Sequence, residues 1–150
     1  MRRWMKSRVS EPDLQALMEV ARAARKGAYA RYSHFAVGAA LLWEDGEIVS
    51  GANIENASYG LTMCAERVAL YAALARGKPG CELVAVCVVG APEQTREPEP
   101  LTTPCGACRQ VLYECNPRML VGCAGPAGLH RFRLEELLPQ AFGPDDLTRP

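Results

Sequence analysis

One apolar segment constrains the fold of this chain more than any other feature of its sequence. Residues 82–89 read Glu-Leu-Val-Ala-Val-Cys-Val-Val, an almost unbroken apolar run that is rich in β-branched side chains. Such a run is typical of a central β-strand that is buried on both faces of its sheet. We therefore expect a sheet that is covered by helices.

The rest of the chain alternates between helical and strand patterns. Helical spacing of apolar residues occurs at 13–28, 64–76, 105–115 and 134–138, and strand-like segments occur at 35–43, 48–53, 119–123 and 130–134. Loops are expected at 54–63 and 90–103, and a tail at 139–150. The order α-β-β-α-β-α-β-β-α predicts an α/β fold with a mixed sheet. We expect a single domain over residues 1–150, with residues 1–12 as a flexible N-terminal extension.

Charge and hydropathy exclude several classes of protein. The 150 residues include 17 basic and 17 acidic side chains, so the formal net charge is zero. Proteins that bind nucleic acids or anionic membranes normally carry a basic surplus, so we expect neither partner. No apolar run approaches the length of a membrane span, and the basic N-terminus lacks the apolar stretch of a secretory signal. These features predict a cytoplasmic protein.

Two cysteine-containing segments carry the chemistry of the sequence. Residues 62–67 read Thr-Met-Cys-Ala-Glu-Arg and residues 103–110 read Thr-Pro-Cys-Gly-Ala-Cys-Arg-Gln, so each segment places a cysteine at the start of a predicted helix. Cys105 and Cys108 face the same way on a helix, which is the usual two-ligand half of a zinc site. With Cys64 as a third ligand, the fourth position of a zinc ion stays open to water, as in catalytic zinc sites.

Two charged residues follow Cys64 directly. The Glu66 carboxylate would lie beside the metal-bound water without binding the metal, and there it can take a proton from water and return it to a substrate. Three thiolates give the site a net negative charge, which makes the bound water less acidic. A guanidinium from Arg67, hydrogen-bonded to the thiolates, would restore that acidity.

Other interpretations of a Cys-x-x-Cys segment are a redox pair and half of a structural zinc ribbon. The odd total of seven cysteines argues against a complete disulfide framework, and no second cysteine pair or histidine pair completes four zinc ligands. A redox role stays open, but it would make the Cys-Ala-Glu-Arg segment a coincidence. The remaining cysteines are expected to be small core residues, namely Cys81, Cys87, Cys115 and Cys123.

The two segments together resemble the signature of the small, homotetrameric cytidine deaminases. Three further blocks extend the resemblance: Tyr-Ser-His-Phe-Ala-Val-Gly-Ala-Ala-Leu at 32–41, Gly-Ala-Asn-Ile-Glu-Asn-Ala-Ser-Tyr at 51–59, and Glu-Leu-Leu-Pro-Gln-Ala-Phe-Gly-Pro-Asp-Asp-Leu at 136–147. The resemblance implies a three-layer α/β/α fold with a five-stranded mixed sheet and one zinc ion per subunit. It also implies hydrolysis of cytidine and 2′-deoxycytidine to uridine and 2′-deoxyuridine, with release of ammonia, in pyrimidine salvage.

The resemblance also assigns roles to single residues. Glu66 would be catalytic, and Arg67 and Gln110 would support the metal ligands without touching the metal. The groups that would meet the substrate are Asn53 and Glu55 at the ribose 3′-hydroxyl, Phe35 and the Ala65 backbone at the base, the Thr103 carbonyl at the departing amine, and Phe142 of a neighbouring subunit stacked on the base.

Plainer interpretations of the same residues exist. Without the metal motif, Asn53 and Glu55 would be a polar strand end that caps the next loop, Phe35 a core residue, and Phe142 an anchor for its own tail. Three other functions fit parts of the sequence: a zinc deaminase of another aminopyrimidine nucleoside or base, of the blasticidin S type, a structural zinc module, and a thiol-redox protein. Ala36 replaces a proline that is usual in the family, and we expect little functional consequence from that change. The loop at 90–103 is longer than usual and precedes the second cysteine segment, so it leaves substrate preference open but not the chemistry.

Overall fold

The computed structural model describes residues 11–95 and 99–148, so most of the expected N-terminal extension, residues 1–10, lies outside the described residues. The described chain forms a five-stranded sheet with the order β2-β1-β3-β4-β5. The pair β3–β4 is parallel, and the other neighbouring pairs are antiparallel. The helices and strands are α1 (Leu14–Arg25), β1 (Phe35–Trp43), β2 (Ile48–Ala52), α2 (Ala65–Ala75), β3 (Leu83–Pro92), α3 (Gly106–Cys115), β4 (Leu120–Gly125), β5 (Gly128–Arg133), α4 (Leu134–Leu137) and α5 (Pro144–Leu147).

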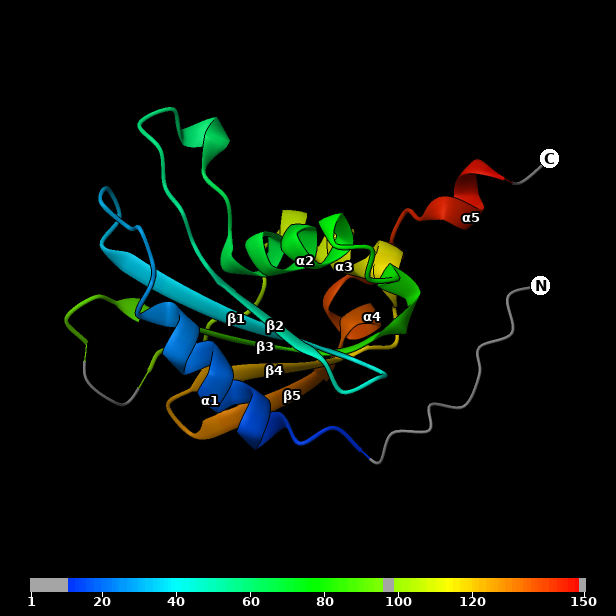
Figure 1. Ribbon diagram of the computed structural model, residues 1–150, viewed down its shortest axis with the longest axis horizontal. Coiled ribbons are helices and arrows are strands. Elements are labelled where there is room, and N and C mark those ends of the chain that lie inside the picture. Colours follow the sequence, from blue (N-terminus) through cyan, green and yellow to red (C-terminus); the bar gives the residue numbers. More distant parts are fainter. Residues whose placement is uncertain (1–10, 96–98, 149–150) are drawn as a thin grey trace.

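Helices cover both faces of this sheet (Figure 1). On one face, Leu17 and Met18 of α1 share a buried cluster with Ala40 of β1. On the other face, α2, α3 and α4 contribute to a second cluster, which contains Leu41 and Trp43 of β1. Adjacent residues of β1 therefore point to opposite layers, as the pleat of a strand requires. The expected three-layer α/β/α fold with a five-stranded mixed sheet is confirmed.

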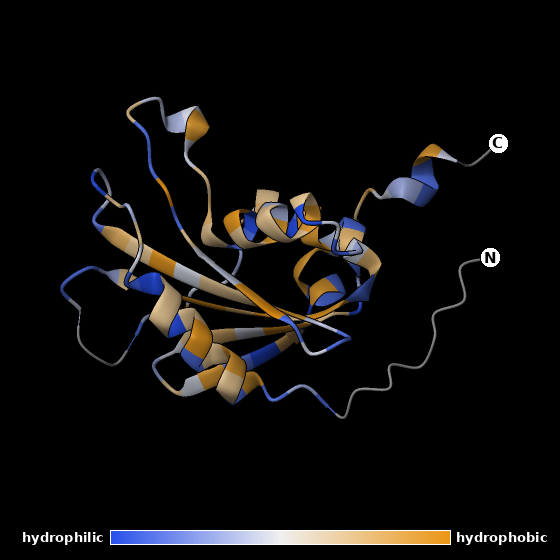
Figure 2. Cartoon of the chain, viewed as in Figure 1, coloured by the Kyte–Doolittle hydropathy of each residue, from blue (hydrophilic) through white to orange (hydrophobic). Residues whose placement is uncertain are grey.

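The apolar segment at 82–89 forms β3, the middle strand of the sheet. Residues 85–91 are all buried, and Figure 2 shows the apolar colouring along the central strands. The strand ends at Pro92 rather than at 89, because β1 continues to pair with it until Phe35 lies opposite Pro92. The first residues of the expected loop at 90–103 therefore belong to the sheet.

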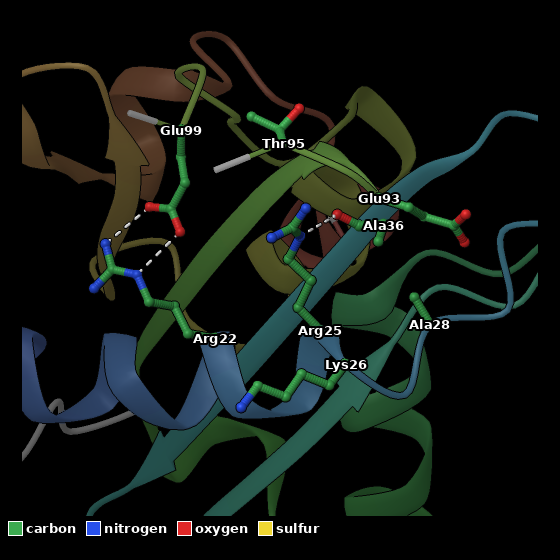
Figure 3. A pocket seen from close by; sticks show the side chains of 8 residues that line it. All are labelled: Arg22, Arg25, Lys26, Ala28, Ala36, Glu93, Thr95 and Glu99. Carbon is green, nitrogen blue, oxygen red and sulfur yellow. Dashed lines mark hydrogen bonds and ion pairs between the residues drawn. The ribbon is translucent and has the colours of Figure 1, made fainter. Parts of the chain in front are cut away.

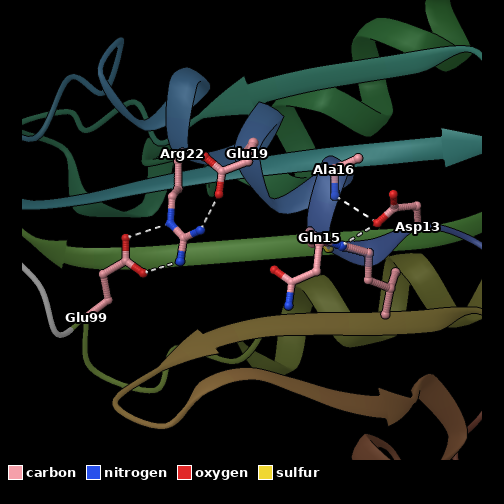
Figure 4. Close-up of polar contacts among 8 residues, drawn as sticks. Asp13, Gln15, Ala16, Glu19, Arg22 and Glu99 are labelled. Carbon is pink, nitrogen blue, oxygen red and sulfur yellow. Dashed lines mark hydrogen bonds and ion pairs between the residues drawn. The ribbon is translucent and has the colours of Figure 1, made fainter.

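The first helix begins and packs through two specific contacts. The Asp13 carboxylate accepts hydrogen bonds from the backbone N–H groups of Gln15 and Ala16, both at 3.0 Å, so Asp13 is the N-cap of α1 (Figure 4). A Cβ atom on Gly38 of β1 would lie 2.1 Å from the Ala21 carbonyl oxygen. Only glycine allows the backbones of α1 and β1 to approach this closely.

A partly buried ion pair ties the chain upstream of the second cysteine segment to α1. Arg22 donates from Nη2 to Glu99 at 2.8 Å and from Nε at 3.1 Å, as Figure 4 shows. The Glu99 side chain is only 9% exposed. The bidentate geometry of this pair fixes the position of Glu99, four residues before Thr103, against α1.

The expected C-terminal tail contains a short helix that the sequence analysis does not predict. Residues Pro144–Leu147 form α5, and the Gly143 N–H donates to the Asp146 carboxylate at 2.9 Å at its start. Figure 1 shows this segment projecting away from the sheet. Among the described residues, no helix has both the length and the hydropathy that a membrane crossing requires.

Candidate active site

The structure brings the three predicted metal ligands together at the starts of two helices. Cys64 is the N-cap of α2, Cys105 is the N-cap of α3, and Cys108 lies in the first turn of α3. Their sulfur atoms all lie within 4.8 Å of one another, and the Cys64 and Cys105 sulfurs are 3.7 Å apart. Two thiolates bound tetrahedrally to zinc at about 2.3 Å would be about 3.8 Å apart. The cluster therefore fits one zinc ion with little rearrangement.

The cluster supplies three protein ligands. Within residues 11–95 and 99–148, no fourth histidine, cysteine or acidic side chain joins it, and no other such group of three is close enough to hold a metal. Cys108 is buried whereas Cys105 is exposed, so the site is open on one side. Three ligands with an open side match a catalytic zinc site and not the closed four-ligand site of a structural zinc module.

The charges at the cluster also favour a metal ion. Hydrogen bonds from Cys108 and then from Arg67 lower the pKa of the Cys64 thiol to about 5, and Arg67 Nη2 lies 3.3 Å from its sulfur. The neighbouring Cys64 thiolate, together with burial, raises the pKa of Cys108. Like charges this close cannot all form unless a cation lies among them. A divalent ion would stabilise all three thiolates at once.

Glu66 lies in the first turn of α2, one helical position beyond Ala65. Its residue surface is 3% exposed, and this burial raises the pKa of its carboxyl to about 7. A carboxyl group with a pKa near neutrality exchanges protons readily in both directions. The structure thus places a buried group that can carry protons in the first helical turn after Cys64.

Asn53 and Glu55 are both held by the segment that begins β1. Asn53 accepts from the Val37 N–H and donates to the Phe35 carbonyl, each at 2.9 Å. Glu55 accepts from the Tyr32 N–H at 2.8 Å and from both the N–H and the hydroxyl of Ser33. These contacts, the Ser33 hydroxyl first, lower the pKa of Glu55, so this carboxyl remains ionised.

The predicted base-contacting residues lie in three different elements of the chain: Phe35 in β1, Ala65 in α2, and Phe142 just before α5. Phe35 is half-buried at the first position of β1, and its ring packs so closely on β3 that a Cβ atom on Gly90 would lie 2.7 Å from it. Ala65 is fully buried. Phe142, by contrast, is 60% exposed, and the Gln110 side chain donates to its backbone carbonyl at 2.8 Å. Gln110 therefore binds the C-terminal segment in this chain.

Two residues that the sequence did not single out support this site. Ser33 orients Glu55 through its hydroxyl, and Arg109 binds the two residues that precede Cys105. Arg109 stands directly after Cys108 in the second cysteine segment, which was the available signal for it.

The other cysteines are placed mostly as expected. Cys87 and Cys123 are buried, and Cys115 is partly buried. The prediction is wrong for Cys81, which is exposed because it lies in the 3-10 turn Gly80–Glu82 before β3 rather than on a core face.

A separate hollow lies on the α1 side of the sheet, away from the cysteine cluster. Figure 3 shows it at the C-terminal end of α1. Its volume is about 620 Å³, and it is lined by Arg22, Arg25, Lys26, Ala28, Ala36, Glu93, Thr95 and Glu99. No cysteine lines it, so it is not part of the candidate metal site.

Comparison with known proteins places this geometry in a family. The family model for the cytidine and deoxycytidylate deaminase zinc-binding region matches residues 11–123. A cytidine deaminase of Halalkalibacterium halodurans is 47% identical over 138 residues, covering 91% of this chain and 98% of that protein. A more distant relative is a blasticidin-S deaminase of Bacillus cereus, which is 29% identical over 89% of this chain and 94% of its own length.

A solved structure agrees with these sequence relatives. The 1.6 Å crystal structure of cytidine deaminase from Burkholderia pseudomallei superposes with a TM-score of 0.77 at 47% identity, covering 85% of this chain and 98% of that chain. The matched region contains all three clustered cysteines and Glu66. The chain belongs to the cytidine and deoxycytidylate deaminase family of zinc-binding enzymes.

Proposed function

We propose that this chain catalyses the hydrolytic deamination of cytidine and 2′-deoxycytidine to uridine and 2′-deoxyuridine, with release of ammonia. The observation that carries this proposal is the cluster of Cys64, Cys105 and Cys108 beside the buried carboxyl of Glu66. Family membership and the 47% identity to a cytidine deaminase support the substrate class. A role in pyrimidine salvage follows from that reaction.

Cys64, Cys105 and Cys108 would hold one zinc ion per subunit. When bound, zinc acts as a Lewis acid that makes a water molecule nucleophilic near neutral pH. Arg67 donates to the Cys64 sulfur at 3.3 Å and so offsets part of the negative charge of the thiolates. This contact would thereby preserve the Lewis acidity of the bound zinc that the reaction requires.

Glu66 moves the protons of the reaction. Its carboxylate accepts a proton from the attacking water and delivers it to N3 of the base, while the oxygen bonds to C4. Glu66 then passes the second proton of that water to the amino group on C4. The C4–N bond breaks and ammonia leaves, so one water is consumed for each ammonia released. The raised pKa of Glu66, about 7, suits both proton transfers.

Asn53, Glu55, Phe35 and Ala65 would bind the nucleoside. A carboxylate that stays ionised and an amide together can accept from and donate to one ribose hydroxyl. Phe35 would form a wall for the base, the Ala65 backbone would contact it, and the Thr103 carbonyl would accept from the departing amine. A ribose site favours a nucleoside over a free base.

A deaminase of the blasticidin S type is the second candidate, and the 29% identical relative is the observation that favours it. An assay of the zinc-loaded protein distinguishes the two. We expect loss of ultraviolet absorbance with cytidine and 2′-deoxycytidine, and none with cytosine, adenosine or blasticidin S. Turnover of blasticidin S alone would establish the second candidate and overturn the first.

We also propose that the chain works as a homotetramer with shared sites. Phe142 is 60% exposed on a projecting segment, and Tyr59 and Leu61 are also exposed, so apolar surface is available for contact with another subunit. In this arrangement Phe142 stacks on the base bound by a neighbouring subunit. Three free thiols as ligands need a reducing compartment, which supports a cytosolic location.

Mixing two defective variants tests the shared site. Phe142→Ala should raise KM, because base stacking contributes about 1–3 kcal/mol. When Glu66→Gln subunits and Phe142→Ala subunits are dissociated and reassembled together, some sites regain both intact groups and a low KM returns. A fully active monomer in sedimentation, or no rescue on mixing, would refute the shared site.

A further inference from the structure

Arg109 makes three side-chain hydrogen bonds, two of them to the segment before a metal ligand and one to α4. Its Nε donates to the Pro104 carbonyl at 2.7 Å. Its Nη2 donates to the Thr103 hydroxyl at 2.9 Å. Its Nη1 donates to the Leu137 carbonyl, the last residue of α4, at 2.7 Å. One planar guanidinium on α3 thus binds two other segments of the chain, residues 103–104 and α4.

The first two contacts act directly on the cysteine segment. The Pro104 carbonyl belongs to the peptide bond that leads into Cys105, so the bond from Arg109 fixes the orientation of that peptide and of the Cys105 side chain. Cys105 is the exposed ligand of the three and lacks the packing that immobilises Cys108. Hydrogen bonding is therefore the principal means of orienting it.

The third contact anchors the guanidinium itself. A charged group that donated only to the loop residues Thr103 and Pro104 would be free to move with them. Leu137, however, belongs to α4, which packs against the core through the buried Leu134. Arg109 is partly buried, so water competes weakly for these acceptors. The loop is thereby fastened to a rigid element.

We propose that Arg109 is a positioning residue that sets the geometry of Cys105, and through it the lifetime of the bound metal. The inference rests on the proposed zinc site, and it extends to the Thr103 carbonyl, which the same guanidinium holds through the Thr103 side chain. Lysine cannot replace it, because a single ammonium has no planar fork to reach three acceptors in different directions.

Arg25 provides a matched control. It also bridges separate segments, donating at 3.0 Å to each of the carbonyls of Ala36, Ala91 and Pro92, but from α1 on the opposite face of the sheet. Figure 3 shows Arg25 in that position. Arg25→Lys therefore removes a comparable bridge and has no contact with the cysteine segment.

The test compares zinc release from purified, zinc-loaded Arg109→Lys, Arg25→Lys and unmodified protein into an excess of a colorimetric chelator. Melting temperature is measured in parallel. We expect both variants to melt earlier, but only Arg109→Lys to release zinc faster, by about 10–100-fold, the usual effect of losing a partner that orients a ligand. Equal release from all three proteins, or equal acceleration in both variants, would overturn the proposal.

Thr103→Val tests the proposal if Arg109→Lys does not fold. It preserves volume and removes only the hydroxyl acceptor, so we expect a smaller acceleration of zinc release, and unchanged release from Thr103→Val would then refute the proposal. If both variants fold, the effects of Thr103→Val and Arg109→Lys should not add, because they remove the same contact. Because no nucleoside is present, inactivity toward cytidine would count against the proposed function and leave this inference standing.

Discussion

The carboxyl of Glu66 is buried in the turn that follows a metal ligand but does not belong to the ligand cluster. We predict that Glu66→Gln keeps a full complement of zinc and loses about 10²–10⁴-fold in kcat, because amide nitrogen cannot accept the proton. Zinc content by atomic absorption and turnover of cytidine are the measurements. Glu114→Gln, an exposed position on α3, should change neither. Near-normal turnover of zinc-loaded Glu66→Gln would contradict the assignment.

Protons and zinc would compete for the Cys64 sulfur, from which Arg67 Nη2 lies 3.3 Å away. Hydrogen bonds from Cys108 and Arg67 lower the pKa of Cys64 to about 5. Arg67→Gln removes one of these bonds, so the thiol pKa rises and a proton displaces zinc at a higher pH. We therefore predict that, as pH is lowered stepwise, Arg67→Gln releases its zinc earlier than the unmodified protein.

The matched control is Arg76→Gln at the far end of α2, where Arg76 forms an exposed ion pair with Glu47. Its zinc-release midpoint should equal that of the unmodified protein. Coincident midpoints for Arg67→Gln and the unmodified protein would show that Arg67 does not tune the thiolate.

At the level of elements, the contact between α1 and β1 depends on one missing side chain. A methyl group on Gly38 would lie 2.1 Å from the Ala21 carbonyl and 2.5 Å from the Arg25 nitrogen, both backbone atoms that cannot rotate away. We predict that Gly38→Ala lowers the free energy of unfolding by about 3 kcal/mol or more, at or beyond the usual range for overpacking. Chemical denaturation measures the loss.

Gly60→Ala is the comparison, since nothing lies within 4 Å of the added methyl group. Its effect should stay within about 0.5 kcal/mol. If Gly38→Ala were as stable as Gly60→Ala, α1 would have room to shift outward, and the close approach would not constrain the layer.

The arrangement of elements followed from patterns of burial in the sequence. The central strand and the alternating faces of β1 were predictable, because buried positions require apolar residues and so leave a recognisable spacing of apolar residues in the sequence. The end of β3 at Pro92 was not, because it depends on where a distant partner strand begins. The exposure of Cys81 was missed for a related reason: a 3-10 turn interrupts the periodicity at that point.

The candidate site was predictable only for residues whose side chains themselves perform the chemistry. Thiolates at helix starts indicate a metal site because few other residues can replace them. The three bonds of Arg109 could not be predicted in the same way, because Pro104 and Leu137 accept through carbonyl groups that every residue possesses. Which backbone groups meet a side chain is decided by tertiary packing.

Across the whole molecule, the cluster joins parts of the chain that are far apart in sequence. Cys64 and Cys105 are separated by 41 positions, and β3 lies between them along the chain. Their sulfurs can meet only after α2 and α3 have both packed on the same face of the sheet, where they contribute to one buried cluster. The cluster is therefore a product of nearly complete folding rather than a local feature of either segment.

That separation has a kinetic consequence. A contact that forms after the folding barrier has been crossed stabilises the native state without stabilising the transition state, so it acts on the unfolding rate alone. Zinc should therefore lower the unfolding rate measured after a denaturant jump. The refolding rate of the chain should be the same with and without added zinc. Refolding that accelerates in proportion to the stability gained would mean that the thiols already assemble in the transition state. If the cluster assembles late, zinc binds only the folded protein and slows its unfolding. The lifetime of the folded protein then depends on the concentration of free zinc.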